Sequence, residues 1–366
     1  MSTLMQASNQ WSSRPADQRF ESLTLLHDHV KAIRAASHAK VLSSRGISCA
    51  PIEDDHKSLV CIGPNGGPVN LTHWSFGQLA QRAGAPAGYL RTLPSPMAAD
   101  CINFGMRQRD AEDIGVLLYK NGGPAELRAA TGPNYGRIWN ETITRALVQR
   151  FGDGLTGDFR VPGEFGKAVE VTKANTTLYA SDRDMWVFLA DETHRIEVPN
   201  RRDGQPGSLA RGFFVWNSEV GSATFGIATF LFDYVCCNRI VWGAEGYNEI
   251  RIKHTSSAPD RWIEQAAPAI EAYANSSAAN VTEAIAAAKA KRIGANSAEV
   301  AGFLAKRFTK SQVSAITAAH MSDEQRPIET LWDATVGVTA YARGIQFQDE
   351  RVRLEREAGK IMSLAS

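Results

Sequence analysis

A long apolar stretch near the middle of the chain, GFFVWNSEVGSATFGIATFLFDYVCCNRIVWG, constrains the fold more than any other feature. It runs from Gly212 to Gly243, and in its segments 213–220 and 224–235 apolar side chains occupy both alternating positions. Strands with this pattern are covered on both faces, because a strand with one solvated face alternates apolar and polar residues. The stretch therefore predicts buried core strands, with a helix over 227–235 as the alternative. Any functional site would then lie at the rims, on Asn217, Ser218 and Glu219 at one turn and on Asn238 and Arg239 at the other.

Other strand signals lie on both sides of this stretch. The segment IGVLLYKNGGPAELRAATG predicts a hairpin, because an apolar run is followed by Asn-Gly-Gly and a second strand. A helix is predicted over 138–151, and the remaining strand candidates are 168–173, 185–191, 194–198 and 248–254. Residues 112–256 are therefore predicted to form a mixed α+β core, a mostly antiparallel sheet with inserted helices.

The two ends of the chain are predicted to be helical. Residues 1–20 are rich in Ser, Gln and Arg and predict a flexible arm, and 21–111 predict a helical N-terminal region with a turn-rich span over 43–70. Residues 257–366 are rich in alanine and predict an all-helical C-terminal region. Its last helix, over about 327–363, contains the charged stretch DERVRLEREAGK, which is interpreted as a solvated face or an oligomer contact. The predicted fold class is α+β.

The charge balance limits the kinds of partner. Forty Lys and Arg against 39 Asp and Glu give a net charge of +1, so any nucleic-acid binding must come from a local patch. One candidate patch between positions 289 and 310 has six basic residues against the single acid Glu299, although a solvated helix face explains it as well. The six are Lys289, Lys291, Arg292, Lys306, Arg307 and Lys310.

A second basic group follows from strand periodicity in NEIRIKHT. His254 alternates onto one face with two isoleucines, whereas Arg251 and Lys253 share the other face at a spacing that suits successive phosphates. Basic residues also protect a solvated sheet edge, so both interpretations stay open. Arg137 and Arg239 complete the predicted nucleic-acid-binding set, and bases would stack on nearby aromatic rings if these are exposed. The aromatic candidates are Tyr135, Trp216 and Trp242.

No catalytic motif stands out in the sequence. The stretch YASDRDMW places Asp182 and Asp184 two residues apart, which suits a metal or an acid pair if it is extended, but a turn is the simpler interpretation. A metal-dependent enzyme would need a further ligand such as Glu219, His194 or His254. P-loop, dinucleotide and Ser-His-Asp signatures are absent from the sequence. The sequence therefore favours a protein that is not an enzyme, with no cofactor and no metal.

Cysteine usage and hydropathy indicate the compartment. The five cysteines are odd in number and show no CxxC spacing, which argues against a disulfide framework or a zinc module. The adjacent Cys236 and Cys237 are interpreted as small buried apolar residues. No apolar run reaches 18 residues, and the first 20 residues contain no apolar leader segment, so we expect a cytoplasmic protein without a membrane span.

Several stretches resemble a known family, the phage/plasmid-like proteins of mobile elements, which is defined only as a domain of unknown function. The matching stretches are SRPADQRFESL, HWSFGQLAQRAGAPAGYLRTLP, LRAATGPNYGRIWN, TLYASDRDMWVFLAD, the apolar stretch itself, IRIKHT and LWDATVGVTAYAR. One departure is Arg239, where relatives are expected to carry glycine, and this implies a turn that does not need positive φ. The resemblance implies a bacteriophage, prophage or plasmid origin and brings no catalytic residues.

The expected function follows from this resemblance. Members look like accessory proteins of replication and recombination modules. We therefore expect a protein that binds DNA, in particular single-stranded DNA, and anneals strands as a homo-oligomer in the cytoplasm of a bacterial host. Two alternatives stay open: a non-enzymatic protein that binds a host factor, for example to block a defence system, and a metal-dependent nucleic-acid enzyme.

Overall fold

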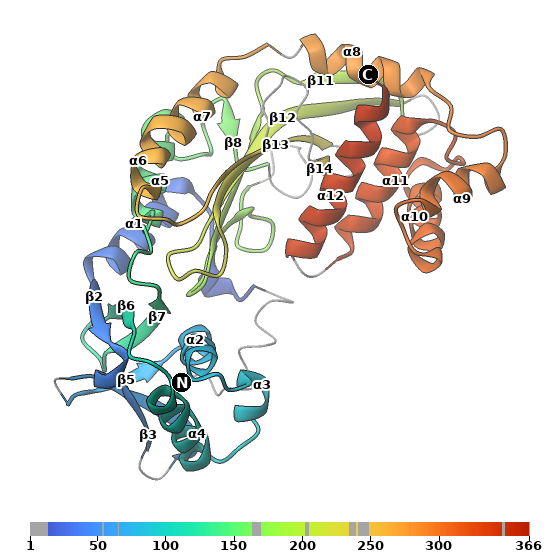
Figure 1. Ribbon diagram of the computed structural model, residues 1–366. Coiled ribbons are helices and arrows are strands. Elements are labelled where there is room, and N and C mark those ends of the chain that lie inside the picture. The colour runs from blue at the N-terminus through green and yellow to red at the C-terminus, as the bar shows by residue number, and fades with distance from the viewer. Residues whose placement is uncertain are drawn as a thin grey trace.

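Two sheets organise the chain, with helices on their faces (Figure 1). The computed structural model describes residues 14–52, 55–64, 66–162, 170–201, 205–233, 239–240, 249–277, 279–345 and 348–365. The α+β class is confirmed, with antiparallel sheets, helices inserted between strands and a helical C-terminal region. None of the described helices combines the length and the apolar character needed to cross a bilayer.

The larger sheet contains the long apolar stretch. All its described strand pairs are antiparallel, in the order β1-β9-β10-β12-β13-β14, with β8, β11 and β15 paired at the side. Its strands are β1 (Arg19–Phe20), β8 (Phe159–Arg160), β9 (Leu178–Ala180), β10 (Met185–Asp191), β11 (Ile196–Arg201), β12 (Gln205–Asn217), β13 (Phe225–Asp233), β14 (Arg239–Ile240) and β15 (Ile250–Ile252).

Strands β12 and β13 are buried on both faces, as the sequence predicted. Phe213 and Val215 point into the core under the N-terminal helices, whereas Phe214 and Trp216 belong to an aromatic cluster on the opposite face. Because β13 continues to Asp233, the alternative helix is wrong for residues 227–233. The β12–β13 pairing places Gly226 opposite Trp216, where only a residue without a side chain leaves room for the indole.

The smaller sheet has the order β2-β6-β7-β5-β4-β3. Its strands are β2 (Ser37–Ser43), β3 (Ser48–Ile52), β4 (Asp55–Ile62), β5 (Pro68–Leu71), β6 (Asp113–Tyr119) and β7 (Glu126–Thr131). The predicted hairpin is confirmed as β6 and β7. Four strands lie within 21–111, a region predicted to be helical. Two of them, β2 and β3, form the edges of the sheet. Most of β2 is exposed, and β3 is a short run of Ser, Cys, Ala, Pro and Ile, so neither strand gives an alternating apolar signal.

Helices cover both sheets. The smaller sheet packs against α2 (His73–Ala83), α3 (Ala87–Leu90) and α4 (Ser95–Gln108). One face of the larger sheet packs against α1 (Leu23–Ala35), α5 (Asn140–Phe151), α6 (Ala258–Arg261), a π-helical turn over Trp262–Ala266 and α7 (Ala267–Ala274). Helix α1 begins at the Ser22 cap, whose side chain accepts from Leu25 N, and buries Leu23, Leu26 and Val30 against α5 and the sheet.

The C-terminal region is a group of helices beside the opposite face of the larger sheet (Figure 1). Its members are α8 (Ala279–Ala290), α9 (Ser297–Ala305), α10 (Lys310–Glu324), α11 (Leu331–Arg343) and α12 (Gln348–Met362). The single helix predicted over 327–363 is therefore wrong, because α11 ends at the Gly344 cap. The charged stretch is also more than a solvated face, since Leu354, Ala358 and Ile361 recur at helical spacing and are buried against the other helices.

Some predictions fall partly or wholly outside the described residues. The predicted arm is described only from residue 14, and its Arg19 and Phe20 pair with β9. Of the predicted strand over 168–173, residues 170–173 are described and are not a strand. Cys236, Cys237, Asn238 and Trp242 lie outside the described residues.

The close approach of Gly226 to Trp216 yields a stability prediction. A Cβ at Gly226 would overlap the indole, so Gly226→Ala is expected to lower the free energy of unfolding by about 1–3 kcal/mol. The control is Gly302→Ala on α9, where a Cβ meets no atom, and where alanine is expected to stabilise the helix by up to about 1 kcal/mol. Urea unfolding measures both, and equal effects would contradict the packing of β13 on β12.

Candidate nucleic-acid interface

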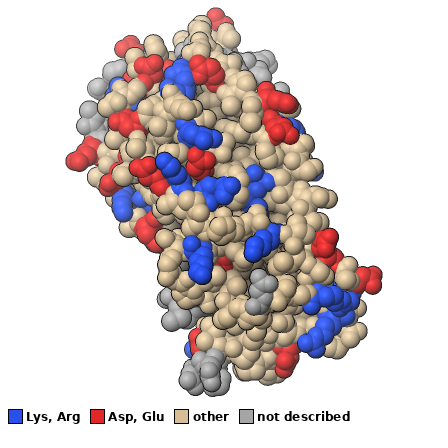
Figure 2. Space-filling view, turned by 90° about the vertical axis from the view of Figure 1, so that its left-hand side faces the viewer, with Lys and Arg blue, Asp and Glu red and all other residues tan. Residues whose placement is uncertain are grey.

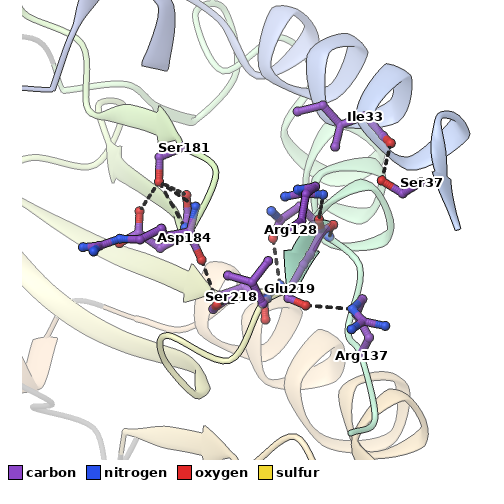
Figure 3. A network of polar contacts seen from close by, with 12 residues as sticks. Ile33, Ser37, Arg128, Arg137, Ser181, Asp184, Ser218 and Glu219 are labelled. Atoms are coloured by element: carbon purple, nitrogen blue, oxygen red, sulfur yellow. Dashed lines mark hydrogen bonds and ion pairs between the residues drawn. The ribbon is translucent and has the colours of Figure 1, made fainter. Parts of the chain in front are cut away.

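A buried carboxylate, Glu219, joins the two sheets at the turn between β12 and β13 (Figure 3). Its Oε2 accepts from Arg128 Nη1 on β7 at 3.0 Å, and its Oε1 accepts from the backbone N of Asn140 at 2.9 Å. Arg137 Nε donates to the Glu219 carbonyl at 2.7 Å. The smaller sheet, the start of α5 and the segment before it are thus fixed to one turn of the larger sheet.

The rest of this turn is also held by other parts of the chain. Val220 O accepts from Trp74 Nε1 at 2.9 Å and from Gln78 Nε2 at 2.8 Å, both on α2. Ser218 O accepts from Tyr135 OH at 2.8 Å, and Asn217 Nδ2 donates to the Ile138 carbonyl at 2.8 Å. Asn217, Ser218 and Glu219, the predicted functional rim, are therefore fully or almost fully buried, and most of their polar groups bind the protein itself.

Arginine and aromatic side chains alternate beside this turn. The Arg34 Cζ lies 3.9 Å from the centroid of the Trp139 ring, and the Arg137 Cζ lies 5.4 Å from the same ring and 5.3 Å from the Tyr135 ring. Tyr135 in turn stacks on His254, with centroids 4.7 Å apart and planes at 22°. We call these five half-buried side chains, Arg34, Trp139, Arg137, Tyr135 and His254, the arginine–aromatic ladder. Each contact between a guanidinium and a ring adds a cation–π attraction.

The ladder brings together three segments that are distant in the sequence. Arg34 lies in the last turn of α1, Tyr135 to Trp139 precede α5, and His254 follows β15. Gly136 makes the closest approach, because its N donates to His254 O at 3.1 Å and a Cβ there would overlap the Thr255 carbonyl. Of the predicted binding residues, Arg137 belongs to the ladder and Lys253 precedes His254 in the chain, whereas Arg251 lies on the other face of the larger sheet, with its Cζ 5.8 Å from the Trp216 ring.

Burial sets the charge of the ladder. The pKa of His254 is lowered by burial and by the nearby Arg137, against its bond to the Gly136 carbonyl, so the imidazole is neutral at pH 7. Its Nδ1 lies 3.0 Å from the Gly136 carbonyl oxygen and therefore carries the proton. Burial also lowers the pKa of Arg137, although Tyr135 and Glu219 oppose the effect. At neutral pH the positive charge of the ladder is carried by Arg34 and Arg137.

Exposed cations surround the ladder. Lys31 lies one turn before Arg34 on α1, Lys120 N donates to the Ala36 carbonyl at the end of that helix, and Lys253 follows β15. These three exposed lysines form no ion pair within the described part of the chain, whereas Arg251 pairs with Glu249 at 2.6 Å. Figure 2 shows the side of the molecule that carries α1 and α5, and Lys and Arg side chains form a band across the middle of it.

The second predicted basic patch lies elsewhere. Its six residues belong to α8, α10 and the loops after α8 and α9, on the opposite side of Figure 1 from α1 and α5. Several are already engaged: Arg292 pairs with Glu329 at 3.2 Å, Lys291 Nζ donates to the Leu364 carbonyl, and Arg307 lies 5.4 Å from the Phe303 ring. The structure therefore separates the predicted basic residues into two groups and does not combine them into one surface.

The aromatic residues predicted to stack on bases are also placed differently. Trp216 is only 5% exposed, since it packs on Trp186 at 5.8 Å, and Arg356 lies 5.3 Å from its ring. Stacking of bases on Trp216 is therefore excluded in this conformation. In β14, the backbone of Arg239 pairs with that of Phe232 in β13. The side chain of Arg239 lies outside the described residues. Arg34 and Trp139, at one end of the ladder, were not predicted, because their contact joins segments about a hundred residues apart.

The two aspartates of YASDRDMW have different surroundings. Asp184 accepts from Arg14 Nη1 at 3.1 Å and from Ser181 Oγ at 3.0 Å, and the Ser181 N donates to the Asp184 carbonyl. The predicted turn is therefore confirmed. Asp182 instead lines a cavity of about 340 Å³ with Asp17, His29, Glu126 and Arg128, among other residues. Two further carboxyl groups, those of Asp17 and of Glu126 on β7, thus line the same space as Asp182, and the sequence did not reveal either.

Burial affects the acids of this cavity. It raises the pKa of Asp182, and it raises the pKa of Glu126 together with the Asp182 charge. Neither Glu219 nor His194 joins them, since Glu219 pairs with Arg128 and the His194 Nδ1 lies 3.2 Å from Asp191 Oδ2. Within the described ranges, no three His, Cys, Asp or Glu side chains are placed so that they could hold one metal ion.

Comparison with known proteins places the chain in a family. A family model described as a domain of unknown function, DUF932, matches residues 166–359, which is more than half of the chain. The chain belongs to the DUF932 family. The matched part contains most of the larger sheet and the C-terminal helices, so the ladder joins His254 of the DUF932 region to Arg34, Tyr135, Arg137 and Trp139 from outside it. No curated protein and no solved structure matches the chain.

The buried pair at the centre of the junction yields a second prediction. Arg128→Met or Glu219→Gln alone leaves a buried charge or donor without its partner, so each is expected to cost about 3–5 kcal/mol in urea unfolding. The double variant is expected to lose much less than the sum, because no unpaired charge is left. Arg292→Met is the control, since its exposed pair with Glu329 is worth less than about 1 kcal/mol. Additive losses would contradict the direct pairing.

The cavity acids yield a third prediction, on pH. Glu126 and Asp182 have a higher pKa in the folded protein than in the unfolded protein. Such a carboxyl group favours folding at pH values below its pKa in the unfolded state, and this contribution is lost as the pH rises through its pKa in the folded state. Glu126→Gln and Asp182→Asn are therefore expected to raise the free energy of unfolding at pH 7 and to have no such advantage near pH 3.5. The control is Asp100→Asn at an exposed position of α4. A loss of stability at pH 7 in both cavity variants would contradict the assignment.

Proposed function

We propose that this DUF932 protein binds nucleic acid along the face that carries the arginine–aromatic ladder. The observation that carries the proposal is the set of exposed lysines Lys31, Lys120 and Lys253, which form no ion pair with any residue that the structure describes, near a ladder that holds two guanidinium groups in place. Since the chain as a whole is almost neutral, such a local concentration of positive charge is what binding to a phosphate backbone requires.

The geometry supports contacts with phosphates more than stacking of bases. Both Arg34 and Arg137 lie against the Trp139 ring, so a base would have to displace a guanidinium to stack there. The two arginines, held by their rings, have N–H groups that suit phosphate oxygens. Binding of this kind depends on charge and little on sequence.

A second part of the proposal concerns the origin of the protein and its role in the cell. On the sequence resemblance, we propose that the protein comes from a phage or plasmid and acts on single-stranded DNA during recombination or replication, as a homo-oligomer in the host cytoplasm. A surface that binds phosphates without reading bases suits an annealing protein, because annealing must accept many sequences. The exposed apolar side chains of α3 and α4, Tyr89, Met97 and Phe104, are between 54% and 66% exposed and suit contacts between copies of the chain.

The same apolar side chains favour a second candidate function. Exposed large apolar residues on the neighbouring helices α3 and α4 also suit a host protein as partner, as in a protein that blocks a host factor. The two candidates differ in where binding is lost: substitutions at the ladder affect nucleic acid, and substitutions at Phe104 affect a protein partner.

A salt series with a labelled oligonucleotide tests the first candidate. Fluorescence anisotropy is expected to show binding to single-stranded DNA that weakens steeply with salt. Lys31→Ala/Lys253→Ala is expected to weaken binding and to reduce the slope of log K against log salt by about 1.4, since each lost phosphate contact on a single strand removes about 0.7.

The matched control is Lys306→Ala/Lys310→Ala, which removes the same charge from exposed positions in the C-terminal helices. It is expected to bind as the unsubstituted protein does. Loss of binding only in this control would move the interface to the C-terminal patch, and no binding of any oligonucleotide at low salt would overturn the proposal. Cleavage of the oligonucleotide that requires magnesium would instead support the enzyme alternative.

A further inference from the structure

Two buried thiols face each other across an edge of the smaller sheet. In the antiparallel pairing of β3 with β4, Cys49 lies directly opposite Cys61, and both are free thiols that are about 5% exposed. Strand β3 is the last strand of the sheet, so its outer side faces α4 and no further strand. This pair was not predictable from the sequence, because the two cysteines are not in a CxxC motif and only the register brings them together.

The hydrogen bonds show which kind of pair this is. Cys49 N donates to Asn103 Oδ1 at 2.7 Å, and Asn103 Nδ2 donates to the Cys49 carbonyl at 2.8 Å, so both polar groups of Cys49 point away from β4. Pro51, two residues on, has the same orientation and has no N–H to leave unpaired at the outer edge. Cys49 and Cys61 are therefore a non-hydrogen-bonded pair, the type in which opposite Cα atoms approach to about 4.5 Å.

This type of pair meets the distance requirement for a disulfide. Disulfides span Cα–Cα distances of about 4.4–6.8 Å, and side chains of a non-hydrogen-bonded pair lie on the same face of the sheet. We propose that Cys49 and Cys61 are a redox-active dithiol that closes to a cross-strand disulfide by exchange with a small-molecule disulfide. This function is separate from nucleic-acid binding and does not depend on it.

The exchange proceeds in two steps that balance. The thiolate of one cysteine attacks a sulfur of the small disulfide, forms a mixed disulfide and releases one small thiolate. The second cysteine, as a thiolate, then attacks the sulfur of the first, forms the cross-strand bond and releases the second small thiolate. The two protein thiols are oxidised, the small disulfide is reduced to two thiols, and these take up the two protons that the cysteines lose.

The surroundings of the thiols determine the rate. Burial raises the pKa of Cys61 to about 11 and, together with Cys61, raises that of Cys49 to about 12, so the thiolate needed for attack is rare at neutral pH. Cys61 has the lower pKa of the two thiols and is therefore the better first nucleophile. While the pH is below the pKa of Cys61, the rate of exchange is expected to rise about tenfold for each unit by which the pH is raised. The site therefore responds to sustained oxidation and not to brief exposure.

The test uses the full chain, reduced and then incubated with excess glutathione disulfide at pH 7, 8 and 9. After the remaining thiols are blocked, peptide mass spectrometry is expected to find a Cys49–Cys61 link with the loss of two hydrogens, formed faster at each higher pH, and the oxidised protein is expected to melt a few degrees higher. Cys101→Ser is the matched control, because Cys101 is exposed on α4, and it is expected to form the link at the same rate.

Cys49→Ser and Cys61→Ser are expected to lose the link, and circular dichroism checks that they fold. Because burial limits the access of glutathione disulfide to these thiols in the native protein, a control experiment refolds the chain from urea in the same glutathione buffer. If no Cys49–Cys61 link forms either in the native protein or on refolding, or if one of these cysteines links to another cysteine instead, the proposal is overturned.

Discussion

The ion pair between Arg128 Nη1 and Glu219 Oε2, 3.0 Å apart and almost wholly buried, holds the two sheets of this protein in one arrangement. Such a pair adds little net stability by itself, because both charges lose their water, but it is costly to break. Glu219 compensates for this loss through its second oxygen, which accepts from the Asn140 backbone, and through its carbonyl, which accepts from Arg137. The position of β7, of α5 and of the segment before α5 follows from this one residue.

The proposed interface depends on the same junction. Arg137 bonds to the Glu219 carbonyl and lies against both Trp139 and Tyr135, so the ladder keeps its order only while the turn stays in place. Because three separate segments contribute, no single element of this DUF932 chain carries the surface. The cavity acids lie close to the junction as well, since Arg128 lines both sites. A function at either site therefore requires both sheets.

The sequence predicted those strands that are marked by a pattern of neighbouring residues. The hairpin of β6 and β7 and the doubly covered strands β12 and β13 follow from turn residues and from apolar side chains on both faces. Arg137 and Lys253 were also predicted as binding residues and belong to the ladder or lie next to it in the chain, whereas Arg251 lies over Trp216 on the other face of the sheet. The contact of Arg34 with Trp139 and the meeting of Glu126 with Asp182 were not predictable, because only long-range packing brings these residues together. Edge strands β2 and β3 were missed because β2 is mostly exposed and β3 is short and contains Pro51, so neither shows an alternating apolar pattern in the sequence.

Hydrogen exchange with and without a single-stranded oligonucleotide tests the central claim most directly. The technique reports protection of backbone amides along the chain and needs no substitution that would disturb the junction. The account predicts slower exchange at the end of α1, over residues 135–140 and around residues 250–255, with no change in α8, α9 and α10. Protection confined to α8, α9 and α10, with unchanged exchange at the ladder, would contradict it.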